Sequence, residues 1–215
     1  MTKIKICGIT NYEDARNAVD LGADFLGFNF CKKSPRYVGC KKACSIIKSI
    51  IKKSTKAKIF GVFVNEKTEK IAEIADYCSL DFIQLSGQED LDFVNLLKKS
   101  TDKKIIKVFR IGKKIPSLRR NFFVNNVDYF MLDTFKNGLY GGTGKTFNLN
   151  IAKHIDNKKM FLAGGLNERN VSAAIKKLNP FAVDVCSSIE KSAGIKDFGK
   201  MKKFIGAVKG IKGDF

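Results

Sequence analysis

Histidine and closely paired cysteines are scarce in this chain of 215 residues. His154 is the single histidine, and the six cysteines form no Cys-x-x-Cys pair; the closest two are Cys40 and Cys44. So few ligands argue against a structural zinc site, and we expect no bound metal. Apolar runs of the roughly 18–20 residues that span a bilayer are also missing, which argues against a membrane protein.

We also expect no secretory signal. The first residues of the chain, MTKIKICGIT, carry charge but no apolar segment of the usual length. Free thiols are typical of a reducing compartment. We therefore expect a cytoplasmic protein with no membrane partner.

Acidic residues are few relative to basic ones: 21 Asp and Glu stand against 40 Lys and Arg, a formal net charge of +19. Such a charge is typical of some nucleic-acid-binding proteins. Here, however, the lysines are scattered in pairs, few aromatics accompany them, and no recognition motif is present. The pattern favours a solvated basic surface that attracts an anionic small-molecule substrate, with no nucleic acid expected as a partner.

What the chain does contain is a regular alternation of two patterns. Apolar runs of strand length are near-continuous, which is typical of strands covered on both faces. They lie at 3–7, 24–30, 58–64, 81–85, 104–109, 127–132, 160–164 and 181–186. Segments with a 3.6-residue period lie at 13–22, 70–78, 91–99, 169–178 and 197–209. Without any linker, this alternation predicts an α/β fold, a single (β/α)8 TIM barrel over residues 1–215; residues 112–126 and 134–157 are too irregular for a clear helix prediction.

Chemistry in such barrels sits where the strands end, at the carboxyl edge of the sheet. Cys7 ends the first apolar run and Asp133 follows the sixth. A carboxyl at an apolar mouth is desolvated, which raises its pKa and lets it hold a proton. The two side chains are therefore candidates for an acid and a base that face each other, although a capping aspartate and a buried structural cysteine remain alternatives.

A phosphate site is predicted after the seventh and eighth strands. Gly164 and Gly165 allow the backbone to approach a ligand closely, and Ser187 and Ser188 add hydroxyl donors before a short helix that we expect to begin at Ile189-Glu190. The alternative is a tight turn with capping serines. A second glycine-rich stretch, LYGGTGKTF at 139–147, ends like a nucleotide-binding loop but has leucine where that motif needs its first glycine, so we expect no ATP or GTP site there.

Several motifs together resemble phosphoribosylanthranilate isomerase, the tryptophan-pathway enzyme. They cover the chain in order: KICGIT (5–10), GFNF…SPRYV (27–38), GVFVN (61–65), IQLSG (83–87), FLAGGL (161–166) and AVDVCSSIE…GIKD (182–197). The resemblance implies an isomerase that performs a cofactor-free Amadori rearrangement on a phosphosugar substrate. It also leaves a homodimer or a neighbouring pathway enzyme as a possible partner.

The resemblance implies a role for each candidate residue. Asp133 would protonate the furanose ring oxygen, and Cys7 would then take the proton from C2′. Arg36 would hold the anthranilate carboxylate, while Asp184 and Gln84 would bind the rest of the substrate. Gly164, Gly165, Ser187 and Ser188 would hold the phosphate.

Four positions depart from the family pattern. Ser86 replaces the histidine of IQLHG, and Ala193 stands where proline is usual. In DVCSSIE, Cys186 replaces a serine and Ser188 replaces a glycine, which would strain the backbone if that site needs a positive φ. These departures concern binding strength more than reaction type.

A different enzyme class remains as an alternative on the same barrel. Lys107 lies within the fifth apolar run, and a lysine inside a barrel can form a covalent imine as a Schiff-base aldolase does. The alternating pattern of KIIKVF does not determine the direction in which Lys107 points.

Overall fold

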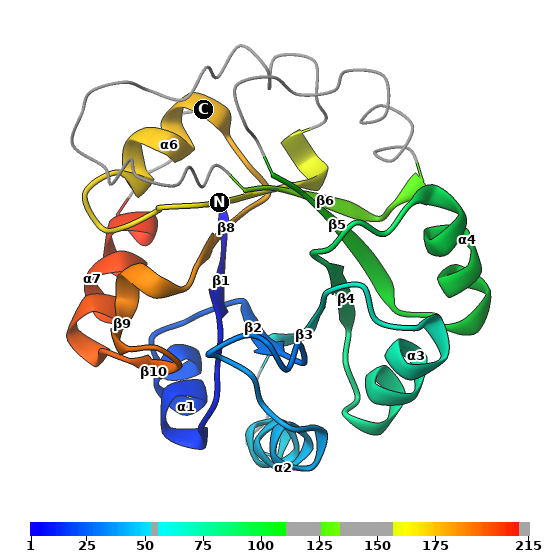
Figure 1. Ribbon diagram of the computed structural model, residues 1–215. Helices are drawn as coiled ribbons and strands as arrows, with labels where there is room; N and C mark the ends of the chain where they lie inside the picture. Colours follow the sequence, from blue (N-terminus) through cyan, green and yellow to red (C-terminus); the bar gives the residue numbers. More distant parts are fainter. Residues whose placement is uncertain (53–55, 111–125, 134–156, 211–215) are drawn as a thin grey trace.

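Eight parallel strands close into a barrel in which each strand pairs with the next and β8 pairs with β1 (Figure 1). The structure is a computed structural model that describes residues 1–52, 56–110, 126–133 and 157–210. The strands are β1 (Lys3–Cys7), β2 (Phe25–Asn29), β3 (Lys58–Phe63), β4 (Phe82–Leu85), β5 (Lys104–Arg110), β6 (Tyr129–Asp133), β7 (Met160–Ala163) and β8 (Ala182–Val185). The predicted (β/α)8 barrel is confirmed, with strand ends within about two residues of the apolar runs.

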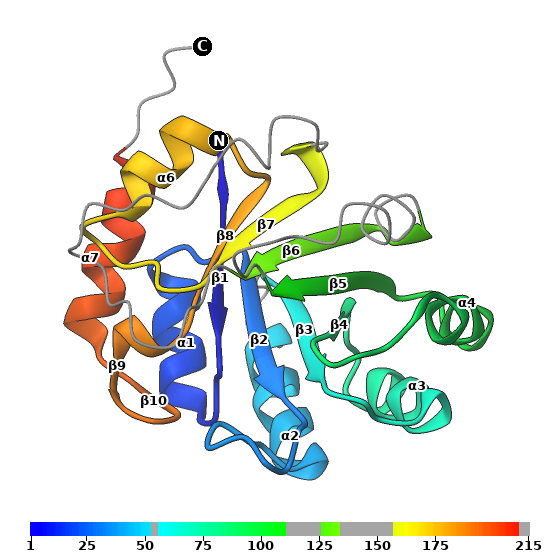
Figure 2. The ribbon, with the colours of Figure 1, turned by 45° about the horizontal axis from the view of Figure 1, so that its top comes forward.

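The helices form a ring around the outside of the barrel (Figures 1 and 2). They are α1 (Tyr12–Asp20), α2 (Cys40–Ile51), α3 (Thr68–Tyr77), α4 (Leu91–Ser100), α6 (Val171–Leu178) and α7 (Phe198–Lys209). Asn11, Asp90 and Asp197 cap α1, α4 and α7 by accepting a backbone N–H bond in the first turn. The glycine-rich stretch 139–147 and most of the two irregular segments lie outside the described residues. Within the described ranges, no helix has the length and apolarity that crossing a membrane requires.

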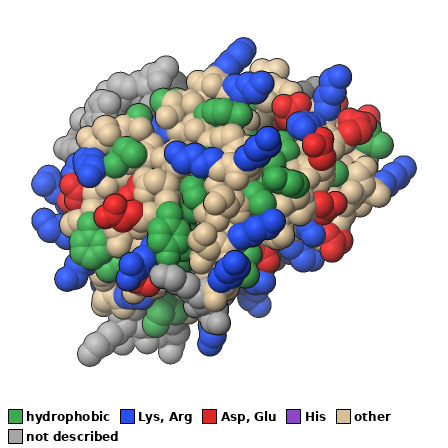
Figure 3. Space-filling view, turned by 90° about the horizontal axis from the view of Figure 1, so that it is seen from below, with side chains coloured by type: hydrophobic (Ala, Val, Ile, Leu, Met, Phe, Trp, Pro, Cys, Tyr) green, Lys and Arg blue, Asp and Glu red, His purple; other side chains and the backbone are tan. Residues whose placement is uncertain are grey.

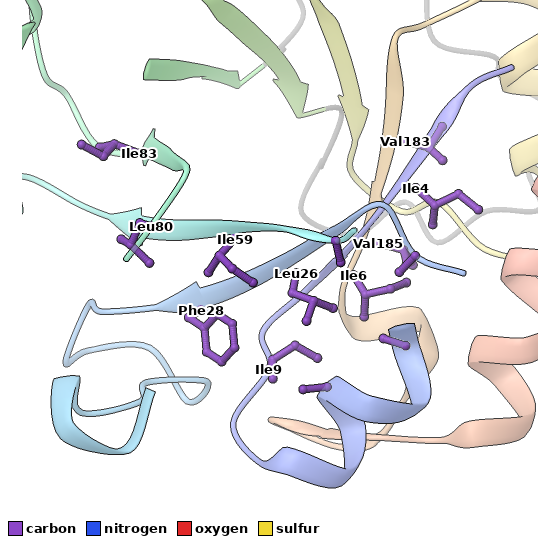
Figure 4. Packing of buried hydrophobic residues seen from close by; sticks show 14 of the residues in the cluster. Ile4, Ile6, Ile9, Leu26, Phe28, Ile59, Leu80, Ile83, Val183 and Val185 are labelled. Atoms are coloured by element: carbon purple, nitrogen blue, oxygen red, sulfur yellow. The ribbon is translucent and has the colours of Figure 1, made fainter. Parts of the chain in front are cut away.

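Alternation along each strand sends side chains to two separate cores. Ile4 and Ile6 of β1 point to the helix side of the barrel wall, where Leu26 and Val185 also pack (Figure 4). The barrel interior is filled mainly by phenylalanines, and Phe60 and Phe82 stack there with ring centroids 4.2 Å apart. On β1 the same alternation directs Lys5 and Cys7 inward. A charged residue and a thiol therefore share the barrel interior with the phenylalanine cluster.

The Schiff-base hypothesis for Lys107 is wrong, because Lys107 faces the helix side of the wall. Its neighbours Ile106 and Val108 belong to the interior core, so Lys107 points the other way. Its ammonium is buried and bonds to Glu89 Oε2 at 2.5 Å and to Gly87 O at 2.9 Å. An amine held in this way cannot meet a substrate at the barrel mouth.

The short helix expected at Ile189-Glu190 is also misplaced. A single 3-10 turn, η3, covers Ser187–Ile189, and the chain then enters a small hairpin of β9 (Glu190–Ser192) and β10 (Ile195–Lys196). Another 3-10 turn, η2 (Asn157–Lys159), precedes β7. The hairpin carries Glu190 and Lys196 back toward β1, where both become part of the site described below.

The basic side chains are dispersed on the face seen in Figure 3. Lysine and arginine are spread over that face, with acidic side chains gathered among them on one side. Several lysines there and elsewhere are paired locally, such as Lys58 with Asp81 and Lys104 with Asp128. This distribution is consistent with the solvated basic surface that the composition favours.

Candidate active site

A pocket of about 200 Å³ opens at the carboxyl ends of β4 to β8. Its wall includes six of the predicted site residues: Gln84, Asp133, Gly164, Gly165, Asp184 and Ser187. Cys7, Arg36 and Ser188 are not in that wall. A larger hollow of about 710 Å³ lies beside α1 and β10, and contains none of the predicted site residues, so we place the site in the smaller pocket.

Asp133 and the Cys7–Cys186 pair reach this pocket from separate parts of the barrel. Asp133 ends β6, is partly exposed and lies in the pocket wall. Cys7 ends β1, on the far side of β7 and β8, and is 9% exposed behind Cys186, which is itself in the wall. The predicted acid therefore opens directly on the pocket, whereas the predicted base lies just behind its surface.

The surroundings of Cys7 favour its thiolate. A hydrogen bond with Cys186 is the largest influence and lowers the pKa of Cys7 to about 6, against the opposing effect of burial. The Lys5 and Lys196 cations act in the same direction as Cys186, while the Asp184 carboxylate opposes them. The pKa of Cys186 is raised in turn, first by its bond to Cys7 and then by burial. Cys186 therefore serves as the thiol donor and Cys7 as the anion.

Lys5 is a charged residue that the sequence reasoning missed. Its ammonium is fully buried inside the barrel, 2.7 Å from Asp184 Oδ1 and 5.1 Å from the centroid of the Phe60 ring. Burial would lower the pKa of Lys5, but the Asp184 carboxylate and Cys7 together raise it above the ordinary value. The alternation of KIKIC, with Ile4 and Ile6 on the outer face, is the signal that could have placed it inside.

Arg36 already has a carboxylate partner in the protein. Its Nε and Nη2 donate to Glu190 Oε1 and Oε2 at 2.9 and 2.6 Å, and Lys196 Nζ donates to Glu190 Oε1 at 2.9 Å. Burial opposes ionisation of Glu190, yet Arg36 and Lys196 hold the pKa of this carboxyl below its usual range. Because a guanidinium has five donors, the Nη1/Nη2 edge of Arg36 remains suited to a second carboxylate.

The paired glycines adopt the conformation that favours glycine. Gly164 has φ of 90° and Gly165 has φ of 68°, and an added Cβ at Gly165 would meet nothing within 4 Å. Ser187 lies in the pocket wall, but Ser188 Oγ donates to Leu166 O and so ties the β8 loop to the β7 loop. Ser188 is not among the residues with positive φ, so the strain that its replacement of glycine might have caused is not present.

Gln84 and Arg110 add polar groups to the opposite wall. Gln84 Nε2 donates to Ser86 Oγ at 3.1 Å, while Gln84 Oε1 is buried with no hydrogen-bond partner in the part of the chain that the structure describes. Arg110 ends β5, donates to Ser86 O at 3.3 Å and lies in the pocket wall. Arg110 is a pocket residue that the sequence motifs do not identify, and it adds a cation to a site predicted to bind an anion.

Donors for a metal ion are not assembled in this region. Across residues 1–52, 56–110, 126–133 and 157–210, no group of three or more His, Cys, Asp or Glu side chains is arranged to hold one. The pocket and the residues beside it instead offer a carboxyl group, a cysteine whose pKa is lowered, several cations and a pair of positive-φ glycines. Such a set suits proton transfer within an anionic substrate.

Comparisons with known proteins show the family to which the chain belongs. A family model described as N-(5′-phosphoribosyl)anthranilate (PRA) isomerase matches residues 4–207. The curated relative from Aquifex aeolicus with that enzyme name is 44% identical over 207 residues, which are 95% of this chain and 97% of the relative.

Two solved structures are similar to the chain over nearly its whole length. One is described as mutually generated monomers of the dimeric phosphoribosylanthranilate isomerase from Thermotoga maritima, with a TM-score of 0.80 and 33% identity over 98% of this chain and 100% of that one. The other is a phosphoribosyl anthranilate isomerase in complex with reduced 1-(o-carboxyphenylamino)-1-deoxyribulose 5-phosphate. Its TM-score is 0.81 and its identity 34%, with the same coverage.

Proposed function

Because the chain belongs to the N-(5′-phosphoribosyl)anthranilate isomerase family, we propose that the rim pocket is its active site and that Cys7 and Asp133 move the protons. The enzyme isomerises N-(5′-phosphoribosyl)anthranilate in tryptophan biosynthesis. One observation carries the assignment of roles. Asp133 and Cys186 line the same pocket, and Cys186 is hydrogen-bonded to Cys7, whose thiolate is favoured by nearby cations.

The two proton transfers follow from the chemistry of the substrate. Asp133 delivers a proton to the ring oxygen of the sugar, which opens the ring and leaves an iminium between C1′ and the anthranilate nitrogen. The iminium withdraws electrons, so the C2′ proton becomes acidic enough for the Cys7 thiolate to remove. The resulting enolamine tautomerises to the ketone, 1-(o-carboxyphenylamino)-1-deoxyribulose 5-phosphate. The substrate supplies its own electron sink in this scheme.

The anionic ends of the substrate are held on two sides of the pocket. Arg36, oriented by Glu190, binds the anthranilate carboxylate through its Nη1/Nη2 edge. The backbone amides near Gly164 and Gly165 and the Ser187 hydroxyl bind the phosphate. The Ser188 hydroxyl donates to Leu166 O and so positions this loop.

The uncharged centre of the substrate lies between these ends. The unpartnered Gln84 Oε1 accepts a hydrogen bond from a sugar hydroxyl or from the anilino N–H. Asp184, fixed by Lys5, accepts another. Both side chains line the pocket, so they place hydrogen-bond acceptors beside the sugar hydroxyls and the anilino N–H of the substrate.

The test of these roles compares steady-state turnover of the phosphoribosyl substrate by the parent enzyme and by Cys7→Ala and Asp133→Asn. Loss of a general acid or base lowers the rate by about 10²–10⁴-fold, and we expect kcat to fall by that amount in each variant. Cys40→Ala and Asp20→Asn change a cysteine and an aspartate on the outer helices and should retain parental turnover. Near-parental turnover in Cys7→Ala or Asp133→Asn would show that the assignment is wrong.

We also propose that the protein forms a homodimer and that nucleic acid is not a partner. The Thermotoga maritima relative is named as dimeric, which supports a homodimer here, and light scattering of the purified protein would test it. The dispersed basic surface supports the expectation that nucleic acid is not a partner. Tight binding to mixed DNA or RNA with a steep salt dependence would contradict it.

A further inference from the structure

Cys7 ends β1, and Cys186 directly follows the neighbouring strand β8. The register of β1 and β8 pairs Lys5 with Asp184 and Ile6 with Val185, so the next residue on each chain is a cysteine. Adjacent strands are about 4.7–4.9 Å apart. Disulfides form between Cα atoms about 4.4–6.8 Å apart, which includes this spacing.

The two sulfur atoms also point to the same side of the wall. Alternation directs Cys7 inward with Lys5, and Cys186 lies in the wall of the pocket into which Asp184 also projects. A Cβ added at Gly8 would lie 2.9 Å from Cys186 Sγ, so this sulfur is packed against the backbone that follows Cys7. The two thiols are also hydrogen-bonded to each other, so their sulfurs are neighbours in the folded protein.

Their chemistry divides the two thiols into an attacking and a resolving group. Oxidation of cysteine by peroxides proceeds through the thiolate and follows its exposure to solvent. Cys7 is mostly thiolate at neutral pH because its pKa is about 6. Cys186 keeps its proton, is partly exposed and opens on the pocket, through which a molecule as small as a hydroperoxide reaches both sulfurs.

We propose that Cys7 is a site of oxidative modification by hydroperoxides, and that Cys186 converts the oxidised Cys7 into a reversible intramolecular disulfide. In the first step the Cys7 thiolate attacks the peroxide, the O–O bond breaks, and Cys7 becomes a sulfenic acid as hydroxide leaves. In the second step the Cys186 sulfur displaces the sulfenic hydroxyl, which departs as water with the Cys186 proton. The two cysteines lose two electrons in total, and the peroxide gains them.

The disulfide removes the group that takes the C2′ proton, so oxidation switches the isomerase off. This consequence rests on the proposed role of Cys7, whereas the disulfide itself does not. By capturing the sulfenic acid, Cys186 also protects Cys7 from further oxidation to the sulfinic acid, which ordinary thiols do not reduce. A small dithiol then restores both thiols and the activity.

The experiment treats the purified enzyme with hydrogen peroxide at pH 7, measures activity, and repeats the measurement after dithiothreitol. Tryptic digestion under non-reducing conditions then separates the peptide of residues 6–16, which contains Cys7, from that of residues 178–191, which contains Cys186. The parent should lose most of its activity, regain it with dithiothreitol, and yield these two peptides joined with the loss of two hydrogens. Cys40→Ser removes a sulfur–sulfur contact elsewhere in the protein, the one between Cys40 and Cys78, and should behave as the parent does.

Cys186→Ser keeps a hydroxyl of similar size but cannot form the bond. We expect no joined peptide in this variant, accumulation of Cys7 sulfinic acid, and little recovery with dithiothreitol, each relative to its own untreated activity. If the oxidised parent contains no joined peptide, or recovers no better than Cys186→Ser, the proposal is overturned. A joined peptide in a protein that lacks isomerase activity would instead contradict the proposed function and leave the disulfide established.

Discussion

Cysteines that contact each other at the barrel rim and between two helices have opposite chemistry. At the barrel rim, Cys7 lies beside Cys186, with the Lys5 and Lys196 cations close enough to favour a thiolate. Between α2 and α3, Cys40 Sγ and Cys78 Sγ are 3.5 Å apart. There, burial is the largest influence on Cys78 and the neighbouring thiols act in the same direction, so its pKa is raised.

The difference shows that a sulfur–sulfur contact alone does not make a cysteine reactive. Both pairs bury one thiol against another, but only the rim pair is surrounded by fixed positive charge. The rim charges are themselves held by acids: Asp184 holds Lys5, and Glu190 holds Lys196. At the rim, buried ion pairs therefore hold the cations that stabilise the Cys7 thiolate. The cysteines between the helices behave as part of the apolar core.

The comparison is sharpened most by direct labelling of the thiols with iodoacetamide. At pH 7 a thiol with a pKa near 6 is about nine-tenths ionised, whereas one with a raised pKa is less than about one-hundredth ionised, so Cys7 should react at least about 100-fold faster than Cys78. Mass spectrometry of each peptide with time gives the two rates.

Accessibility differs as well, so the pH dependence decides the cause. The labelling rate of Cys7 should be half-maximal near pH 6, while that of Cys78 should still rise above pH 9. Equal pH profiles for the two residues would mean that the rim charges do not control ionisation.

Removal of Lys5 should have the next largest effect. Lys5→Met takes away a cation that favours the Cys7 thiolate and leaves Asp184, which opposes it, so the pKa of Cys7 rises above about 6. Each unit of increase beyond pH 7 costs about tenfold in thiolate, and we expect kcat/KM at pH 7 to fall about 10–100-fold. The loss should shrink as the pH is raised toward 9, because the thiol then ionises.

Lys3→Met is the matched control for this variant. Lys3 lies two residues earlier on β1, but its ammonium pairs with Asp24 and is largely exposed. Its removal should leave both kcat/KM and its pH profile close to the parent. A loss in Lys5→Met that is independent of pH would show that Lys5 acts only by holding Asp184.

The sequence predicted the barrel because each strand is an apolar run. Such a run can be recognised without knowing which residues pack against it. The sequence did not predict the β9–β10 hairpin. The residues of that hairpin, EKSAGIK, show neither the 3.6-residue repeat of a helix nor the apolar run of a strand. The sequence placed Cys7 and Asp133 at strand ends, since that position follows from the order of the elements alone. These parts depend on local pattern and topology.

The charges around Cys7 could not be read in the same way. Arg36 and Glu190 are 154 positions apart, and their bond exists because the hairpin turns back toward β1. Lys5 appeared to be one more surface lysine in a chain of many, although the alternation of KIKIC pointed inward. Cys186 was visible only as a departure from a motif, and its contact with Cys7 depends on the β1–β8 register that closes the barrel.

Loss of the Cys186 thiol should lower activity less than loss of Lys5, because Lys5 also holds the pocket residue Asp184. Cys186→Ala removes the hydrogen-bond donor that most lowers the pKa of Cys7. A hydrogen bond to a charged group contributes about 1.5–3 kcal/mol, so the acid limb of kcat/KM should move from near pH 6 to higher pH by about one to two units. Cys186→Ser retains a donor and should keep the limb near its original position. An acid limb that stays near pH 6 in Cys186→Ala would show that Cys186 does not lower the pKa of Cys7.

The smallest effect on activity belongs to the helix pair. Cys78 is 1% exposed, so Cys78→Ala leaves a small cavity and should lower the free energy of unfolding by about 1–2 kcal/mol, measured by urea denaturation. Because neither cysteine of this pair lines the pocket, kcat/KM and its acid limb should match the parent. A shift of that limb in Cys78→Ala would couple the two regions and break the distinction between a thiol set by nearby charge and a thiol set by packing.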